Sequence, residues 1–267
     1  MSAATDRLLG ALDALPPVSL DEIVAEAAMM TRVDRKYAVP VDVAETVLGM
    51  LPAGTRALEI DGSRAARYAS TYFDTVELDC YHRAAQPRRR RLKVRVRTYL
   101  DSGTAYLELK TRGARGTTVK ERMPHPAEMP DRLMPAERRE IALALASVGA
   151  DEQAALHPVL ETRYRRSTLL LPGGEGRATI DTELEWLLLV GAIDPADRPV
   201  LRRPALVVIE TKSGARPSAV DRLLWQHGQR PVRLSKYGTG LAAFAPALPH
   251  SRWHRTLRRD LALATAA

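Results

Sequence analysis

The sequence predicts an α+β protein built around an antiparallel β-barrel whose interior is charged. Between residues 88 and 122, apolar and charged residues alternate with a period of two, which places them on opposite faces of β-strands. Three such strands follow one another there, and the same alternation returns at 207–212. Antiparallel strands with one apolar and one charged face can close into a barrel with a polar interior.

An ordinary sheet with its charged face in water has the same alternation. The charged faces of this chain, however, are mostly basic, and like charges on neighbouring strands repel each other unless an anion lies between them. A barrel interior with many arginines and lysines and a few carboxylates suits a polyanion together with a divalent cation.

Local patterns in the first half of the chain predict both helices and strands. Prolines end the first predicted helix, and Ser19 with Glu22 forms a capping box at the start of the second. The predicted helices lie at 2–15, 19–30 and 42–51, with one further helical turn at 78–85. The predicted strands lie at 32–39, 56–60, 67–74, 88–97, 106–110 and 118–122.

The second half opens with a helix and continues with a second set of strands. A Pro-Gly-Gly sequence at 172–174 predicts a hairpin turn. The predicted strands lie at 159–164, 166–171, 177–184, 186–190 and 205–212, with a loop at 192–203. The predicted helices lie at 136–148, 218–227 and, as a basic amphipathic segment, 252–267. The expected organisation is a helical segment at 1–29, a strand-rich domain at 30–243 and a basic tail at 244–267.

Composition limits the classes of function. The chain has 267 residues, a formal net charge of +8 and an isoelectric point of about 9.9, which indicate an acidic partner. The single cysteine, Cys80, excludes an internal disulfide and favours a reducing, cytoplasmic location. We recognise no signal peptide and no run of the ~18 apolar residues that a membrane span needs. Attachment to a membrane would therefore require an unidentified partner protein.

Lysine is rare in this chain: of 40 lysines and arginines, only six are lysine. An ammonium group and a guanidinium group differ in shape and hydration, so a compact phosphate contact can reject arginine. Four of the six lie in the alternating strands. The alternative explanation is that lysine is found at these positions by chance. The six are Lys36, Lys93, Lys110, Lys120, Lys212 and Lys236.

Common catalytic motifs are missing, including a P-loop, a Rossmann glycine fingerprint, a nucleophile elbow and an HExxH helix. The six histidines have no metal-binding spacing, and one cysteine cannot build a cysteine-based zinc site. Four carboxylates on strand faces offer oxygen ligands for Mg²⁺ or Mn²⁺, with a salt bridge as the alternative for each: Glu108, Asp181, Glu183 and Glu210. Glu210 is the strongest candidate because it is the carboxylate of an otherwise strongly apolar strand.

Nine short motifs stand in a consistent order at 34–37, 72–74, 93–97, 108–111, 120–122, 164–166, 177–184, 209–212 and 234–237. Together they resemble the VTC domain, the polyphosphate polymerase domain of the vacuolar transporter chaperone. That family belongs to the CYTH-like, triphosphate tunnel metalloenzyme superfamily. Each motif alone is weak, but the ordered set is fairly specific and covers about residues 30–243.

The resemblance implies an antiparallel eight-stranded tunnel with flanking helices, whose basic lumen holds a triphosphate or a growing polyphosphate. It assigns phosphate contacts to Lys36, Arg95, Arg97, Lys110, Lys120, Tyr164, Arg166, Arg177 and Lys236. Catalytic roles are expected for Arg95, Arg97, Lys110, Lys120, Arg166 and Lys236. Strand parity adds Arg122 and Lys212, and Arg233 stands where the family often has another lysine. The resemblance also places the metal, Mn²⁺ or Mg²⁺, on Glu210.

The implied activity is transfer of the γ-phosphate of ATP to phosphate, pyrophosphate or a polyphosphate end, with release of ADP. The CYTH triphosphatases and class IV adenylyl cyclases of the superfamily open instead with a Glu-x-Glu-x-Lys strand. The matching positions here are Arg32, Asp34 and Lys36. Loss of the first acid favours the VTC branch.

Two other functions stay open at this point. With water as the acceptor, the same tunnel would be an inorganic or nucleoside triphosphatase. A non-catalytic module would bind polyphosphate or nucleic acid through basic runs such as 88–91 and 258–259, with a steep salt dependence. Specific recognition of nucleic acid is not expected, because aromatic residues make up only 5% of the chain and are not interleaved with the basic runs.

Overall fold

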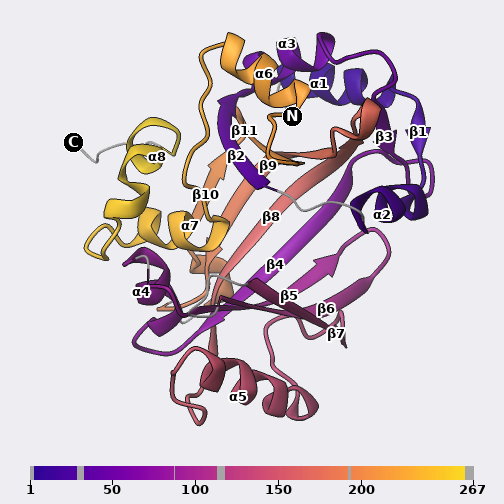
Figure 1. Cartoon of the computed structure of the whole chain (residues 1–267). Coiled ribbons are helices and arrows are strands. Elements are labelled where there is room, and N and C mark those ends of the chain that lie inside the picture. Colours follow the sequence, from indigo (N-terminus) through magenta and orange to yellow (C-terminus); the bar gives the residue numbers. More distant parts are fainter. Residues whose placement is uncertain (1–2, 29–32, 87, 113–117, 192–193, 262–267) are drawn as a thin grey trace. The chain divides into compact units, whose positions relative to one another are not determined.

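The computed structural model describes residues 3–28, 33–86, 88–112, 118–191 and 194–261 (Figure 1). Over these residues the protein is α+β, with antiparallel strands and flanking helices, as the sequence predicts. The chain forms two compact units. The first consists of residues 1–67, 164–184 and 202–234, and the second of residues 68–163, 185–201 and 235–267.

The strands of the first unit follow the order β2-β11-β9-β8. Strand β11 is antiparallel to both β2 and β9. Two short strands, β1 and β3, pair in parallel, and β3 also pairs with β8. The bounds are β1 (Pro17–Val18), β2 (Val33–Pro40), β3 (Arg56–Leu58), β8 (His157–Leu170), β9 (Arg177–Leu188) and β11 (Leu206–Ser213). Strands β8 and β9 each contribute residues to both units.

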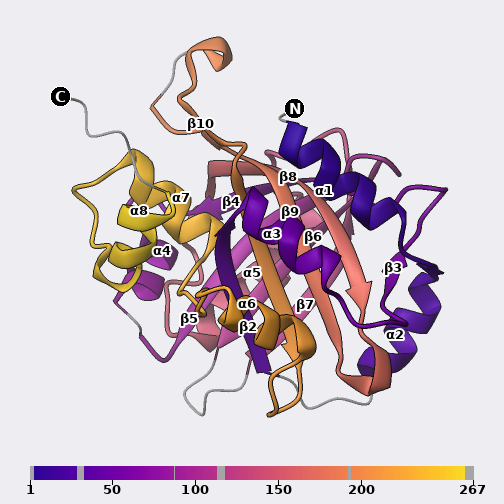
Figure 2. The ribbon, with the colours of Figure 1, turned by 90° about the horizontal axis from the view of Figure 1, so that it is seen from above.

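Three helices cover the apolar face of this first sheet: α1 (Ala3–Asp13), α3 (Val41–Gly49) and α6 (Ala219–Gln226) (Figure 2). Leu8, Val47 and Leu224 of these helices pack against Tyr37 and Ile209 of the strands, and all five are buried. The alternation along β2 and β11 therefore turns Tyr37 and Ile209 to the helices and Lys36 and Glu210 to the opposite face. Arg35 is an exception, because it lies on the helix side and its NH1 is 3.6 Å from Asp221 of α6.

A fourth helix of the first unit, α2 (Leu20–Ala28), begins at the predicted capping box. The backbone N–H of Glu22 donates to Ser19 Oγ, and the Ser19 N–H donates to the Glu22 carboxylate. Its Ile23 packs against Leu170 of β8. The predicted residues 29–32 at the end of this segment lie outside the described part of the chain.

The second unit contains the strand order β4-β5-β6-β7, in which neighbouring strands are antiparallel. Helix α5 (Arg138–Ser147) packs its Ile141 and Leu145 against Val94 and Leu107 of the sheet (Figure 1). The bounds are β4 (Ala66–Asp74), β5 (Arg91–Tyr99), β6 (Thr104–Arg112) and β7 (Thr118–His125). The strand orders of the two units together contain eight strands, the number that the resemblance to the VTC domain implies.

Three further helices pack together in the second unit: α4 (Asp79–Ala85), α7 (Lys236–Phe244) and α8 (His254–Arg259). The sequence does not predict α7, because Gly238 and Gly240 lower its helix propensity. The structure explains both glycines. A Cβ at Gly238 would overlap the ring of Trp253, and one at Gly240 would overlap the ring of Trp186.

Several predicted boundaries are wrong. The strands predicted at 159–164 and 166–171 form one strand, β8 (His157–Leu170), because the burial pattern changes phase near Arg165 without ending the strand. Residues 177–190 likewise belong mostly to one strand, β9. The predicted loop at 192–203 contains β10 (Val200–Arg203), which pairs with β9.

Other corrections concern the ends of elements. Strand β5 begins at Arg91, after the start of the arginine run. Val119 of β7 is 47% exposed, so this strand lacks the predicted buried apolar face. The predicted tail helix is shorter, and its residues 262–267 lie outside the described chain. The 3₁₀ turns are Pro135–Glu137, Pro172–Gly174, Pro195–Asp197 and Ser251–Trp253.

The pairing is open at both ends of the strand orders. In the described part of the chain, β2 pairs only with β11 and β7 only with β6, so hydrogen bonds do not join the strands into a ring. Among the described residues, none of the helices is both long enough and apolar enough to cross a membrane.

Candidate functional site

A charged cluster lies on the face of β2 and β11 that points away from the helices. Glu210 of β11 stands opposite Lys36 of β2. The Lys36 Nζ is 2.5 Å from Glu210 Oε2, and the Lys212 Nζ contacts Glu210 Oε1. Ile209 and Thr211, which alternate with these residues along β11, are buried on the other side of the strand. We call Lys36, Glu210 and Lys212 the Glu210 cluster.

Burial and charge act against each other in the Glu210 cluster. Burial disfavours the charged form of Glu210, but Lys36 and Lys212 outweigh it and hold the pKa of this carboxyl well below its usual range. Burial, with a contribution from Lys36, lowers the pKa of Lys212 to about 8, although Glu210 opposes the shift. One carboxylate between two ammonium groups leaves a net positive charge, which suits an anionic ligand.

Arg166 of β8 contributes a third cation close to this cluster. It donates to both carboxylate oxygens of Asp181, at 2.6 and 2.8 Å, and its guanidinium carbon lies 5.2 Å from the ring centroid of Tyr164. Burial alone would lower the pKa of Arg166, but Asp181, Tyr164 and Glu210 together raise it. The two-point contact fixes the plane of the guanidinium, so Asp181 acts as a positioning residue for Arg166.

The remaining predicted residues of the first unit are more dispersed. Arg177 stands opposite Lys212 in the pairing of β9 with β11. Glu183 has a φ of 53°, a left-handed conformation that interrupts the regular alternation of β9. Its Oε1 lies 3.7 Å from Arg165 NH1. Arg233 is exposed in the segment that follows α6.

A second charged cluster lies on β5, β6 and β7 of the second unit. Glu108 of β6 stands opposite Arg95 of β5, whose Nε donates to Glu108 Oε2 at 2.8 Å. Glu108 Oε1 lies 3.3 Å from Lys120 Nζ and 3.6 Å from Arg97 NH1. Burial would raise the pKa of Glu108, but Arg95, Arg97 and Lys120 lower it to about 2. We call these four residues the Glu108 cluster.

Buried tyrosines extend from the Glu108 cluster into the core. Arg95 NH1 donates to the Tyr72 hydroxyl at 3.3 Å, and the Tyr72 ring stacks on Tyr237 with centroids 5.2 Å apart. The Tyr237 hydroxyl donates to the buried Asp74. Burial would raise the pKa of Tyr72, but Arg95, Lys236 and Arg97 outweigh burial and lower it. The positive charges of Arg95, Lys236 and Arg97 therefore act on the buried Tyr72 side chain.

Other lysines lie along the same sheet face. The Lys93 Nζ donates to Ser235 Oγ at 3.0 Å, and this hydroxyl also caps α7 by accepting from the Gly238 N–H. Lys110 stands opposite Lys93 on one side and opposite Lys120 on the other. The N-terminal cap of α7 therefore holds the Lys93 side chain in position.

Arg122 lies against aromatic rings. Its guanidinium carbon is 3.5 Å from the ring centroid of Tyr106, and its NH2 donates to the Tyr99 hydroxyl at 3.3 Å. Of the residues predicted from the sequence, Lys36, Tyr164, Arg166, Arg177, Asp181, Glu183, Glu210, Lys212 and Arg233 lie in the first unit. Arg95, Arg97, Glu108, Lys110, Lys120, Arg122 and Lys236 lie in the second.

The sequence analysis did not assign site roles to Tyr72, Lys93 or Ser235, which contact cations or the end of α7 next to the Glu108 cluster. Each lies inside a motif that was already noted, at 72–74, 93–97 or 234–237. The rarity of lysine also pointed to Lys93. The contacts of Tyr72 and Ser235 could be found only from the structure.

The carboxylates fit a divalent metal in one way. In the part of the chain that the structure describes, no three His, Cys, Asp or Glu residues form a group that could hold a metal ion. Mg²⁺ and related ions, however, commonly bind one or two carboxylates and complete their coordination with substrate phosphates. Glu210 fits this arrangement because its two oxygens contact mobile ammonium groups, whereas both oxygens of Asp181 accept from the rigid guanidinium of Arg166.

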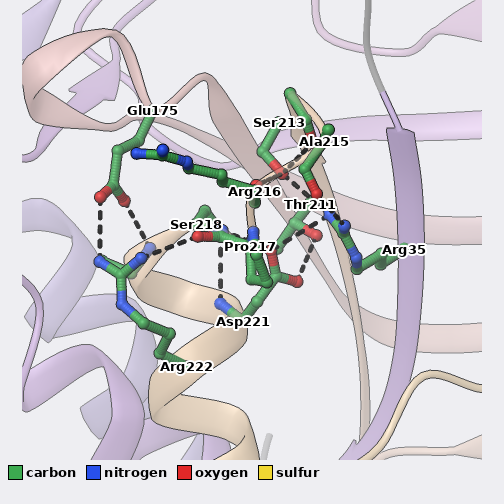
Figure 3. Close-up of polar contacts among 12 residues, drawn as sticks. Arg35, Glu175, Thr211, Ser213, Ala215, Arg216, Pro217, Ser218, Asp221 and Arg222 are labelled. Carbon is green, nitrogen blue, oxygen red and sulfur yellow. Dashed lines mark hydrogen bonds and ion pairs between the residues drawn. The ribbon is translucent and has the colours of Figure 1, made fainter.

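A buried network supports the Glu210 cluster from behind. Asp221, at the start of α6, is fully buried, and its Oδ1 accepts from the hydroxyls of Thr211 and Tyr37, each at 2.7 Å. Its Oδ2 accepts from the Ser218 N–H and Oγ at 2.8 Å (Figure 3). Because Thr211 is the neighbour of Glu210 in β11, these bonds fix the strand that carries the carboxylate.

Comparisons with known proteins agree with the motifs. A family model described as the VTC domain matches residues 31–245. None of the curated proteins matches the sequence.

Solved structures give distant likenesses. A putative adenylyl cyclase from Hippeastrum, described as having a dominant triphosphatase activity, is 15% identical, with a TM-score of 0.41 over 83% of this chain and 100% of the other. A protein from Pyrococcus horikoshii OT3 is 12% identical, with a TM-score of 0.35 over 74% of this chain and 88% of the other. A conserved hypothetical protein from Pyrococcus furiosus is 13% identical, with a TM-score of 0.37 over 78% and 99%.

Proposed function

The chain belongs to the VTC domain family of the triphosphate-tunnel superfamily, and from this premise we propose that it is a metal-dependent polyphosphate polymerase. It would transfer the γ-phosphate of ATP to phosphate, pyrophosphate or the end of a polyphosphate chain and release ADP. The observation that carries the proposal is the repeated arrangement of one carboxylate, the buried Glu108 or the half-buried Glu210, among a larger number of cations.

The proposed reaction needs no nucleophilic side chain. An oxygen of the acceptor phosphate forms a bond to the γ-phosphorus, the bond from that phosphorus to the β–γ bridging oxygen breaks, and ADP leaves with the electron pair. Catalysis of phosphoryl transfer depends mainly on positioning and on neutralising the charge of the oxygens around phosphorus. Arginine and lysine side chains on strand faces supply both.

The residues divide these tasks according to their contacts. Arg166 is held by Asp181, and Arg95 is held by Glu108, so both guanidinium groups are oriented before substrate binds. Lys36 contacts Glu210 and would neutralise phosphate oxygens at that cluster. The other predicted phosphate contacts keep their assigned roles as proposals.

Glu210 would hold Mn²⁺ or Mg²⁺, and the bound ion would supply further positive charge to the phosphate oxygens. To accept the ion, the carboxylate must give up part of its contact with Lys36 or Lys212. Those ammonium groups can then turn to phosphate, because lysine side chains are flexible and carry no fixed geometry.

A product assay tests the proposal. The purified chain is incubated with ATP and either Mn²⁺ or Mg²⁺, with and without a pyrophosphate primer, and products are resolved by gel electrophoresis and ³¹P NMR. Long phosphate chains together with ADP are the expected result. The Glu210→Gln variant, prepared in parallel, controls for a contaminating enzyme because it should not form these chains.

Other products would redirect the assignment. Orthophosphate without chains, lost in the Glu210→Gln variant, would identify a triphosphatase that uses water as the acceptor. Binding of polyphosphate with no turnover in either metal would contradict both enzymatic functions and leave a binding module.

A further inference from the structure

Three strands of the first unit carry cations on one face, and all three are tied to the first turn of α6 (Figure 3). Lys36 lies on β2, Lys212 on β11 and Arg177 on β9. The first turn of α6 contains Ser218, which caps the helix, and the fully buried Asp221. The contacts of this turn reach β2 and β11 from the face opposite the cations.

Asp221 joins β2 to β11 through one of its oxygen atoms. Its Oδ1 accepts from the Tyr37 hydroxyl of β2 and from the Thr211 hydroxyl of β11, each at 2.7 Å. Tyr37 directly follows Lys36, and Thr211 lies between the two members of the Glu210 cluster that β11 carries. A single oxygen atom therefore holds a sequence neighbour of every residue in that cluster.

The residue on the other side of Lys36 also contacts Asp221. Arg35 NH1 lies 3.6 Å from Asp221 Oδ2 and donates to Ser213 Oγ at 3.0 Å. Its NH2 donates to the Ala215 carbonyl at 3.1 Å, just beyond the end of β11. Arg35 thus offsets the charge of a buried carboxylate and holds the end of β11 against β2.

The third strand is tied to α6 by the hairpin that precedes it. The Glu175 carboxylate accepts from the backbone N–H of Ala219, the first residue of α6, and from Arg222 NH2. At the next position, Gly176, a Cβ would overlap the carbonyl oxygen of Lys212. Because Gly176 has no side chain, the start of β9 can lie against β11 while the hairpin is held by the helix.

The contacts of Asp221 favour one register of β2 with β11. Since side chains alternate between the two faces, a slip by one residue would turn the hydroxyl of Tyr37 or Thr211 away from α6. Asp221 would then lose a donor in the interior, which is costly for a buried acceptor. In the observed register Lys36 stands opposite Glu210.

We propose that Asp221 is a positioning residue for the Glu210 cluster and acts on it through the hydroxyls of Tyr37 and Thr211. Asp221 itself does not contact the ligand, because β2 and β11 separate it from the face that carries the cluster. The identity of the ligand, a chain of phosphates, rests on the proposed function, whereas the positioning rests on the contacts of Asp221. The Ser218 hydroxyl, which bonds to the other oxygen of Asp221, is expected to stabilise α6 alone.

Two substitutions of Thr211 separate positioning from stability. Thr211→Val keeps the shape of the side chain and removes the hydroxyl, whereas Thr211→Ser keeps the hydroxyl and removes a buried methyl group. Both variants should unfold at lower urea concentrations than the wild type, the first through the lost hydrogen bond and the second through the cavity. Ser218→Ala is the matched control, because it removes a contact of the same carboxylate on the helix side.

The readout is the dissociation constant for tripolyphosphate, measured by isothermal titration without metal or ATP. Thr211→Val should weaken binding about fivefold, the value of one charge-assisted contact that is no longer well placed. Thr211→Ser and Ser218→Ala should bind within about twofold of the wild type, although both are less stable. If Thr211→Val fails to fold, Tyr37→Phe takes its place, since it removes the hydroxyl on the β2 side, and the same fivefold loss is expected.

Two results would overturn the inference. One is an affinity that follows stability, so that Thr211→Ser loses as much as Thr211→Val; the other is wild-type affinity in Thr211→Val. Failure of the proposed function is distinguishable, because it is read from products made from ATP. A chain that makes no such products, but binds tripolyphosphate more weakly in Thr211→Val than in Thr211→Ser, would lose the polymerase assignment and keep the positioning role of Asp221.

Discussion

The Glu108 and Glu210 clusters both stabilise an ionised carboxylate against burial, but they do so with different cations. In each, a strand places one carboxylate on a charged face and surrounds it with more than one positive group. Around Glu108 these groups are Arg95, Arg97 and Lys120, and Arg95 donates through two of its nitrogens. Around Glu210 the direct contacts are two lysines.

The difference in cation decides what each carboxylate can do. A guanidinium group is always charged and presents its donors in a rigid plane, whereas an ammonium group is a mobile point charge whose pKa shifts readily on burial. Glu108 is therefore held in a fixed pair that orients Arg95. Glu210 is held by partners that can move or lose a proton, as the pKa of about 8 for Lys212 illustrates. Of the two clusters, the Glu210 cluster is the one suited to exchange a cation for a metal.

The largest expected effect separates the two carboxylates by metal dependence. Glu210→Gln should lower turnover about 1,000-fold, because it removes the proposed metal ligand and the charge it supplies to phosphate. Increasing Mn²⁺ should not restore the rate. Glu108→Gln should also lower turnover, through Arg95, but should keep the Mn²⁺ concentration at which the rate is half-maximal. Rates measured across a Mn²⁺ series decide this, and an unchanged metal dependence in Glu210→Gln would remove its assigned role.

The next effect concerns stability, and Glu108 is the residue at which it is measured. Its pKa of about 2 lies below the ordinary value of 4.5, so its ionised form stabilises the fold above pH 4.5 and this contribution is lost as the pH falls toward 2. At pH 7, Glu108→Gln should lower the free energy of unfolding by an amount on the order of 3 kcal/mol. The loss should be about half as large at pH 3.

Urea unfolding at the two pH values measures this effect. Glu121→Gln is the matched control, because Glu121 is an exposed residue of β7, opposite Leu109 in the same sheet. It should change stability little at either pH. An equal loss in Glu108→Gln at pH 7 and pH 3 would mean that packing of the side chain, and not its charge, stabilises this face.

Strands with a regular alternation could be predicted from the sequence, and those with an irregular one could not. Val94, Val96 and Leu107 alternate strictly with charged residues, and the structure confirms that they are buried. The alternation of β8 shifts near Arg165, which led to a predicted break in a continuous strand. Helix α7 was missed because the need for its glycines arises from tryptophans far away in the sequence.

The same limit applies to the candidate site. Motifs indicated which basic and acidic residues to consider, but pairing between distant strands decides which of them meet. That Lys36 faces Glu210 follows from the register of β2 with β11, which no local pattern encodes. The stacking of Tyr72 on Tyr237 likewise depends on the tertiary structure.

The smallest expected effect concerns the lysines of the Glu210 cluster. With a pKa of about 8, Lys212 is protonated below that pH and becomes neutral above it, so a cation is lost as the pH rises from 7 to 9. Affinity for tripolyphosphate should then weaken about fivefold, the value of one charge-assisted contact. Lys212→Arg should bind with nearly the same affinity at both pH values, since arginine stays charged. Isothermal titration at pH 7 and pH 9 measures the difference. An equal decline in both proteins would assign the pH dependence to another group and would remove the distinction between the two clusters that Lys212 supports.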